Sequence, residues 1–309
     1  MRIVLSNIAA KLRWIKPVAL LLLVAGCASA PKPEAPPVPI SPPAAVAPKA
    51  PPRVGLALGG GAARGFAHVG VIQVLEEAGI RPSLVVGTSA GSLVAALYAS
   101  GRNAQQLQAA ALAMDEAAFA DWTLPIFNRG VLRGEALARY VNAQVGNRLI
   151  ENMALPLGIV ATDLRSGEGV LFRRGDTGTA VRASSAVPAV FLPVRIGNQE
   201  FVDGGLVSPV PVRYARSMGA EVVIAVDISS APEGNPSADP LQILLQTFAI
   251  MGKSINTWEL RDADLVVRPA LAGMGSGDFA GKRRAIDAGR AAMQALLPKL
   301  RAALEAKAQ

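Results

Sequence analysis

From residue 53 onward, short apolar runs alternate with longer segments in which apolar residues recur every three or four positions. The short runs predict strands and the longer segments predict helices. The expected strands are 53–58, 84–86, 157–162, 169–173, 200–202, 221–227 and 264–268. The expected helices are 66–78, 92–99, 104–114, 134–145, 178–184, 212–218, 241–259 and 281–305. Strands that alternate with helices are typical of an α/β fold, so we expect a mostly parallel central sheet covered on both faces.

The segment 241–255 is apolar on most of its helical faces. Its polar side chains include Gln242, Gln246 and Lys253. A helix that is apolar nearly all round is usually buried in a protein core. We therefore expect an ordinary buried helix with one side in water.

The first 26 residues have the pattern of an export signal. Four basic residues and no acidic one accompany the apolar run 18–25, which ends in small residues. The run is too short to span a bilayer comfortably. It predicts a signal peptide over 1–26 that is removed from the mature protein.

Cys27, the only cysteine, follows this segment directly. Residues 23–27 resemble the lipobox of bacterial lipoproteins, in which the cysteine is lipidated and becomes the mature N-terminus. A single cysteine forms no intramolecular disulfide, which is compatible with the periplasm. Because Ala28 rather than an aspartate follows, the lipoprotein sorting pattern implies an anchor in the outer membrane, facing the periplasm of a bacterial cell envelope.

Composition divides the rest of the chain into two parts. Residues 28–52 are nearly all Pro, Ala, Lys and Val, which predicts an extended linker of polyproline form that rises about 3.1 Å per residue. The composition becomes globular at residue 53, and the remaining length suffices for one core. We expect a signal peptide (1–26), a lipidated cysteine with its linker (27–52) and one domain (53–309).

The charge balance is basic but modest. The formal net charge is +8 at pH 7, and four of the basic residues belong to the expected signal peptide, which leaves about +4 on the mature chain. Basic residues cluster again at 282–284, which favours an anionic lipid surface or, alternatively, a solvated helix face. The sequence contains no metal-spaced His and Cys set, no Walker loop and no nucleic-acid motif. We expect no metal, no cofactor and no nucleic-acid partner.

A glycine-rich loop follows the first expected strand. Residues 59–65 read Gly-Gly-Gly-Ala-Ala-Arg-Gly, and a helical pattern begins at residue 66. Such a loop exposes backbone N–H groups at the positive end of a helix, which suits a phosphate or the oxyanion of an acyl-transfer intermediate. A dinucleotide site needs an acidic residue after the next strand, but 84–86 runs straight into Gly87. The oxyanion interpretation is the better one.

Ser89 lies between Gly87 and Gly91, directly after the strand 84–86 and before a helix. This Gly-x-Ser-x-Gly arrangement is typical of a nucleophile elbow, in which a sharp turn presents the serine hydroxyl. Glycine is needed on both sides because a strained turn leaves no room for β-carbons. The alternative is an ordinary turn bounded by glycines.

Asp203 ends a short apolar run and precedes Gly204 and Gly205. By frequency alone this is a plain Asp-Gly hairpin turn. The single histidine, His68, precedes Ser89, whereas the histidine of an α/β-hydrolase triad comes last. We expect His68 to be packed rather than catalytic, and a carboxylate that acts directly on the serine is then the simplest base.

The glycine loop, the serine elbow and the Asp-Gly-Gly stretch, in this order, resemble the patatin-like phospholipases. The resemblance is strong over about 53–230, and 130–134 and 182–188 also look like stretches of that family. It implies a patatin-like three-layer sandwich, with Ser89 as nucleophile and Asp203 as base. The implied oxyanion hole comprises Gly59, Gly60, Gly61, Ala62 and Arg64. The implied supporting glycines are Gly87, Gly91, Gly204 and Gly205.

The resemblance also implies an activity, that of a serine lipid acyl hydrolase of phospholipase A or lysophospholipase type. Its substrate is then a phospholipid or another fatty-acyl ester, cleaved through an acyl-enzyme. Two alternatives stand beside it: a broad carboxylesterase or thioesterase, and a membrane-tethered lipid-binding or scaffold protein with incidental catalysis. The irregular segment 119–133, with Trp122 and Phe127, forms a wall or lid of a lipid groove or packs under a loop.

Overall fold

The computed structural model describes residues 50–115, 121, 130–232 and 238–308. All the elements named below belong to one compact unit within Pro48–Gln309. The expected signal peptide, Cys27 and nearly all of the linker lie outside the described residues. Most of the segment 119–133, including Trp122 and Phe127, also lies outside them.

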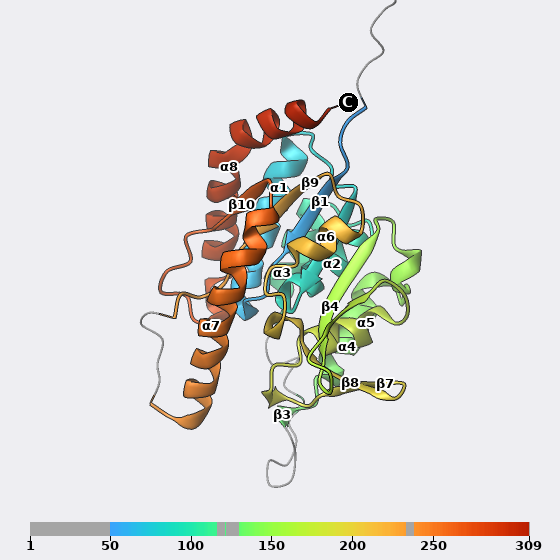
Figure 1. The fold of residues 1–309 in the computed structure, drawn as a ribbon, viewed down its shortest axis with the longest axis vertical. Helices are drawn as coiled ribbons and strands as arrows, with labels where there is room; N and C mark the ends of the chain where they lie inside the picture. The colour runs from blue at the N-terminus through green and yellow to red at the C-terminus, as the bar shows by residue number, and fades with distance from the viewer. Residues whose placement is uncertain (1–49, 116–120, 122–129, 233–237, 309) are drawn as a thin grey trace, which may run out of the picture. The chain divides into compact units, whose positions relative to one another are not determined.

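In the described part of the chain, an eight-stranded sheet forms the centre of the fold (Figure 1). Its strands lie in the order β10-β9-β1-β2-β4-β8-β7, and β5 pairs with β4. They are β1 Val54–Leu58, β2 Leu84–Thr88, β4 Leu157–Asp163, β5 Gly169–Phe172, β7 Val194–Ile196, β8 Gln199–Asp203, β9 Val222–Val226 and β10 Leu265–Val267. The run from β10 to β4 is parallel, whereas β5, β8 and β7 join antiparallel. The expected α/β fold with a mostly parallel sheet is confirmed.

Each expected helix is present within a few residues of its predicted ends. The helices are α1 Ala67–Glu77, α2 Ala90–Ala99, α3 Ala104–Ala113, α4 Glu135–Val145, α5 Thr177–Ser184, α6 Val212–Ser217, α7 Pro240–Glu259 and α8 Lys282–Lys307. Short 3₁₀ turns are η1 Ala62–Phe66, η3 Ile150–Asn152, η4 Gly204–Leu206, η5 Leu260–Asp262 and η6 Phe279–Gly281.

The sheet has an apolar core on each face because successive strand residues point to opposite sides. On β1, Leu56 and Leu58 join the larger core, which also contains residues of α1 and α8 such as Ile72 and Ile286. Ala57 points the other way and packs with residues of α6. A sheet buried on both faces explains why its parallel strands read as continuous apolar runs in the sequence.

Three strands escaped the sequence analysis. β3 (Gly130–Leu132) and β6 (Ala189–Phe191) pair in parallel as a separate two-stranded sheet, and β7 extends the edge of the main sheet. Each is three residues long, which is too short for an alternating pattern to be detected.

The expectation for the helix near 241–255 is wrong. Only Gly252, Asn256 and Glu259 of α7 are buried, whereas several of its large apolar side chains are exposed. Periodicity predicted the helix correctly, but it does not tell what covers each face. No helix among the described residues combines the length and apolarity needed to cross a membrane.

Candidate active site

The strand register places the glycine loop, Ser89 and Asp203 at one edge of the sheet. β1 and β2 are parallel neighbours, so the loop after β1 and the serine after β2 emerge side by side. Along β4, Val160 pairs with Thr88, and the next residue, Ala161, pairs with Asp203. Ser89, which follows β2, therefore lies near Asp203, which ends β8. Backbone pairing alone brings together two residues that are 114 positions apart in the sequence.

Ser89 has the backbone conformation of a sharp elbow. Its φ of 53° and ψ of −124° lie in a region that residues other than glycine rarely adopt. A Cβ at Gly87 would collide with the carbonyl group of Gly91, and a Cβ at Gly91 would collide with the carbonyl group of Leu58. The strand, turn and helix expected around the serine are all present, for the steric reason given above.

Ser184 supports the elbow from α5, and the sequence analysis did not single it out. The N–H of Ser89 donates to the Ser184 hydroxyl oxygen at 2.8 Å. The Ser184 hydroxyl in turn donates to the carbonyl oxygen of Val160 on β4 at 2.5 Å. Ser184 is fully buried, so it fixes the strained serine backbone to the sheet through a chain of two hydrogen bonds.

The Asp203 carboxylate is buried and faces the serine. Its Oδ1 accepts the N–H of Gly205 at 2.7 Å, and both Asp203 and Ser89 line one cavity. Burial raises the pKa of Asp203 to about 6, against the lowering effects of the nearby Ser89 side chain and of the Gly205 N–H. A Cβ at Gly204 would collide with the carbonyl group of Val160, which explains the glycine after the aspartate.

The glycine loop approaches the serine closely. A Cβ at Gly60 would lie 3.1 Å from the Cβ of Ser89, so only glycine fits here without displacement. The N–H of Gly59 donates to Val226 O at 3.0 Å, and the N–H of Gly60 donates to Pro209 O at 2.9 Å.

These hydrogen bonds narrow the set of oxyanion donors expected from the sequence. The N–H groups of Gly59 and Gly60 are already bonded to backbone carbonyl groups and cannot donate to a substrate. The Arg64 N–H donates to Gly61 O at 3.1 Å. Within the described part of the chain, the N–H groups of Gly61 and Ala62 have no such acceptor and both residues line the cavity beside Ser89. The candidate oxyanion hole therefore consists of these two groups.

The Arg64 side chain lies under the same loop. It is 9% exposed and lines the cavity, and its Nε has no acceptor among the described residues. Burial lowers the pKa of Arg64, and the nearby charge of Asp227 opposes this effect. A largely buried guanidinium beside Ser89 attracts negative charge that develops there.

His68 is a packed histidine in the interior of the protein. It is fully buried on α1, and its Nε2 donates to Gly59 O at 2.8 Å. Burial lowers the pKa of His68 to about 4, so the ring is neutral at neutral pH. Its visible role is to hold the first residue of the glycine loop.

A cavity of about 520 Å³ opens over these groups. Ser89, Asp203 and the loop form one side, and α7 supplies an opposite wall that includes Leu245, Phe248 and Ala249. An apolar wall facing a few polar groups is typical of a small-molecule site. The wall or lid considered for 119–133 lies mostly outside the described residues, and the role of α7 in lining the cavity was not expected from the sequence. Among the described residues, no group of three or more His, Cys, Asp or Glu side chains is placed to hold a metal ion.

Comparison with known proteins agrees with this arrangement. The family model for "Patatin-like phospholipase" matches residues 56–216. An uncharacterized NTE family protein of Mycobacterium tuberculosis is 36% identical over 201 residues, which cover 61% of this chain and 52% of the relative. Patatin-like phospholipase domain-containing protein 6 of mouse is 33% identical over 228 residues, 71% of this chain and 16% of that protein. The crystal structure of VipD from Legionella pneumophila aligns with a TM-score of 0.49 at 16% identity, over 81% of this chain and 67% of that one. The chain spans about half the length of the mycobacterial relative.

Proposed function

The chain belongs to the patatin-like phospholipase family, and we propose that it is a serine lipid acyl hydrolase in which Ser89 is the nucleophile and Asp203 the base. The observation that carries this proposal is that the strained Ser89 elbow and the buried Asp203 carboxylate line the same open cavity. The family supports a lipid as substrate, and the apolar wall from α7 suits an acyl chain.

Acylation follows from the contacts of Ser89. Its hydroxyl oxygen attacks the ester carbonyl carbon while the proton passes to the Asp203 carboxylate. The carbonyl oxygen becomes an oxyanion, which accepts hydrogen bonds from the N–H groups of Gly61 and Ala62 beside the Arg64 charge. When the tetrahedral intermediate collapses, the bond to the alcohol breaks. Asp203 returns the proton to the leaving oxygen, and the acyl group stays on Ser89.

Deacylation repeats these steps with water. Asp203 takes a proton from a water molecule, whose oxygen attacks the acyl carbonyl carbon. Collapse of the second intermediate breaks the bond to Ser89, which recovers a proton, and a fatty acid leaves. A carboxylate with a pKa of about 6 is a stronger base than an ordinary aspartate yet is still mostly ionised at pH 7. Burial thus supplies the basicity that an imidazole gives in a triad.

The choice between lipid and small soluble esters is tested by comparing substrates. The full chain is assayed on phospholipid vesicles and on a short-chain soluble ester, with fatty-acid release as the readout. Faster turnover of phospholipid supports a lipid hydrolase. Turnover of the short ester alone would favour the broad esterase, and no turnover of either by a folded protein would favour a lipid-binding or scaffold role.

Ser184→Ala is expected to lower kcat about tenfold with little change in KM. The substitution leaves the Ser89 N–H without its acceptor, so the elbow loses a contact that fixes the nucleophile but does not touch substrate. Ser184→Thr keeps a hydroxyl and is the matched variant that should restore most of kcat. An unchanged kcat in Ser184→Ala, at equal thermal stability, would show that this hydrogen bond does not position the nucleophile.

We propose further that the enzyme is a lipoprotein anchored through Cys27 to the outer membrane and facing the periplasm. The support is the sequence pattern of 1–28. Cys27→Ala should leave an unprocessed precursor in a bacterial expression host, seen as a higher mass and as failure to incorporate labelled palmitate. Normal processing and membrane attachment of that variant would contradict the proposal.

A further inference from the structure

α7 carries a stripe of exposed apolar side chains, which we call the α7 stripe: Ile243, Ile250, Met251 and Trp258. They are 54%, 53%, 45% and 66% exposed. Spacings of seven and eight residues place them along one side of the helix. The buried residues Gly252, Asn256 and Glu259 lie on other faces of the same helix. Four large apolar side chains in a row on a surface helix mark a site of interaction.

The stripe borders the catalytic cavity. Leu245, Phe248 and Ala249, which line the cavity, sit on α7 within one turn of Ile243, Ile250 or Met251. Leu245 both lines the cavity and is 37% exposed. Whatever surface covers the stripe therefore also meets the mouth of the cavity.

α7 is fixed mainly at its carboxyl-terminal half. Glu259 accepts the Ser208 hydroxyl at 2.6 Å, and Asn256 donates to Ser229 at 3.0 Å. The amino-terminal half extends past the strands and overlaps no other helix or strand in Figure 1. In this half, Gln246 donates to Pro232 O at 2.7 Å, and the side chains of the stripe remain exposed.

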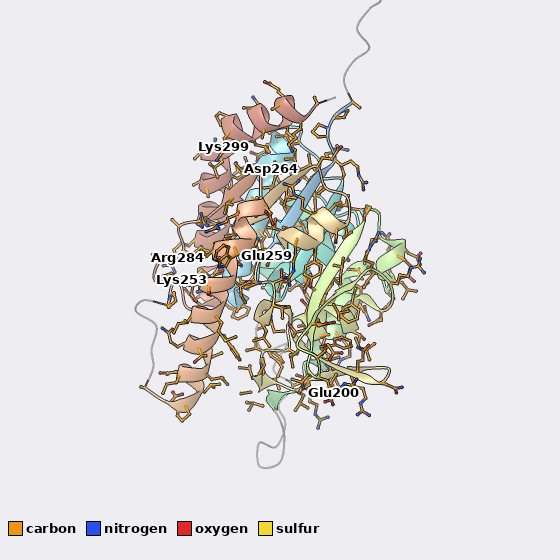
Figure 2. All side chains as sticks on the ribbon, in the orientation of Figure 1. Glu200, Lys253, Glu259, Asp264, Arg284 and Lys299 are labelled. Atoms are coloured by element: carbon orange, nitrogen blue, oxygen red, sulfur yellow. The ribbon has the colours of Figure 1, made fainter. Side chains whose placement is uncertain are left out.

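Two cations lie near the carboxyl-terminal part of the stripe. The guanidinium of Arg261 lies 4.1 Å from the ring centroid of Trp258, and Lys253 is exposed on the same helix (Figure 2). Within α7 the single acidic residue is Glu259, which is buried, and the exposed Asp239 and Asp262 stand just beyond the two ends of the helix. An exposed tryptophan beside a cation is typical of side chains at the boundary between acyl chains and headgroups.

We propose that the α7 stripe docks on a phospholipid surface, so that the catalytic cavity opens toward the lipid. The apolar side chains enter the boundary of the acyl chains, while Lys253 and Arg261 meet headgroup phosphates. A second copy of the chain is the other possible occupant of the stripe, and the experiments below distinguish it from a lipid surface. This inference rests on the proposed function, since it names how the same cavity receives a lipid.

The docking test uses the full chain with Cys27→Ala, so that one new cysteine carries an environment-sensitive dye. Thr247→Cys places the dye among the stripe residues, and Ala302→Cys places it on the exposed part of α8 as the matched control. On addition of vesicles of phosphatidylcholine and phosphatidylglycerol, emission at 247 should shift to the blue and rise severalfold, with no change at 302. Any N-terminal attachment is common to both proteins, so an equal response at both positions, or none at 247, would overturn the proposal.

The kinetic test compares Ile250→Gln/Trp258→Gln with Leu149→Gln. Leu149 is 40% exposed and precedes β4 in the chain, outside α7 and outside the residues that line the cavity. Its replacement therefore removes exposed apolar surface away from the stripe and serves as the control. The double variant should hydrolyse vesicles roughly 30-fold more slowly and a soluble ester within twofold of wild type. Leu149→Gln should change neither rate. Equal losses on both substrates in the double variant, or unchanged vesicle hydrolysis, would overturn the proposal.

Two controls separate this inference from the proposed function. Ser89→Ala should keep the dye response at 247 without any hydrolysis. A dye response without phospholipid hydrolysis by the wild type would reject the proposed activity but not the docking surface. A wild-type dimer in solution that Ile250→Gln/Trp258→Gln converts to a monomer would show instead that the stripe is an interface between copies, and the lipid proposal would fall.

Discussion

Ser89→Ala is expected to lower ester hydrolysis by at least about 10⁴-fold while leaving the fold intact. The substitution removes the hydroxyl that forms the acyl-enzyme. Ser229 also lines the cavity and donates to Asp227 Oδ1 at 2.6 Å, but it lacks the strained elbow backbone of Ser89 and should not replace it. Initial rates on a short ester and on vesicles, together with thermal unfolding, measure the effect.

Ser230→Ala is the matched control for this prediction. Ser230 also lines the cavity, so its replacement removes a hydroxyl from the same space without touching the Ser89 to Asp203 contact. Its rate should stay within about threefold of wild type. Such a change corresponds to less free energy than the roughly 1 kcal/mol that one hydrogen bond contributes. Residual activity of Ser89→Ala above a few per cent would mean that another group performs the attack.

Asp203→Asn is expected to lower kcat by about 10³-fold and to remove the acid limb of the pH profile. In the wild type, kcat/KM should rise with pH through about 6, because the carboxylate acts as base only when it is ionised. The profile of His68→Gln should keep this limb, since Gln retains a donor toward the Gly59 carbonyl. Loss of the limb in His68→Gln, with Asp203→Asn unaffected, would assign the base to the imidazole.

The same pKa values predict how stability depends on pH. The native pKa of Asp203 is raised from 3.8 to about 6, so its contribution to stability is complete below 3.8 and is lost as pH rises through 6. The native pKa of His68 is lowered from 6.5 to about 4, so its effect has the opposite sign, and stability is lost as pH falls from 6.5 to 4. The two effects offset each other in the wild type. The unfolding free energy of wild type minus that of Asp203→Asn should therefore fall by about 2–3 kcal/mol between pH 4 and pH 7.

The sequence was sufficient for the features that depend on local sterics and chemistry. Gly87 and Gly91 are needed because a Cβ at either would collide with the backbone of the elbow, so the pattern around Ser89 specifies its own turn. Asp203 was singled out by elimination, since one histidine stands in the wrong order for a triad. Parallel strands buried on both faces are continuous apolar runs, which is why most of the main sheet was predicted.

The features that escaped the sequence depend on partners far along the chain. The acceptors that occupy the Gly59 and Gly60 N–H groups are Val226 and Pro209, and no local pattern reveals them. Ser184 meets the backbone of a residue 95 positions away. The exposure of α7 depends on what packs against the helix, which periodicity does not report.

The central claim, that Asp203 activates Ser89 for covalent catalysis, is tested most directly by labelling with a fluorophosphonate and measuring the site and rate of adduct formation by mass spectrometry. The full-length wild type should form one adduct on the peptide that contains Ser89, and Ser89→Ala should form none. His68→Gln should react at nearly the wild-type rate and Asp203→Asn at least about 10²-fold more slowly. An adduct on another residue, or equal rates in wild type and Asp203→Asn, would contradict the account.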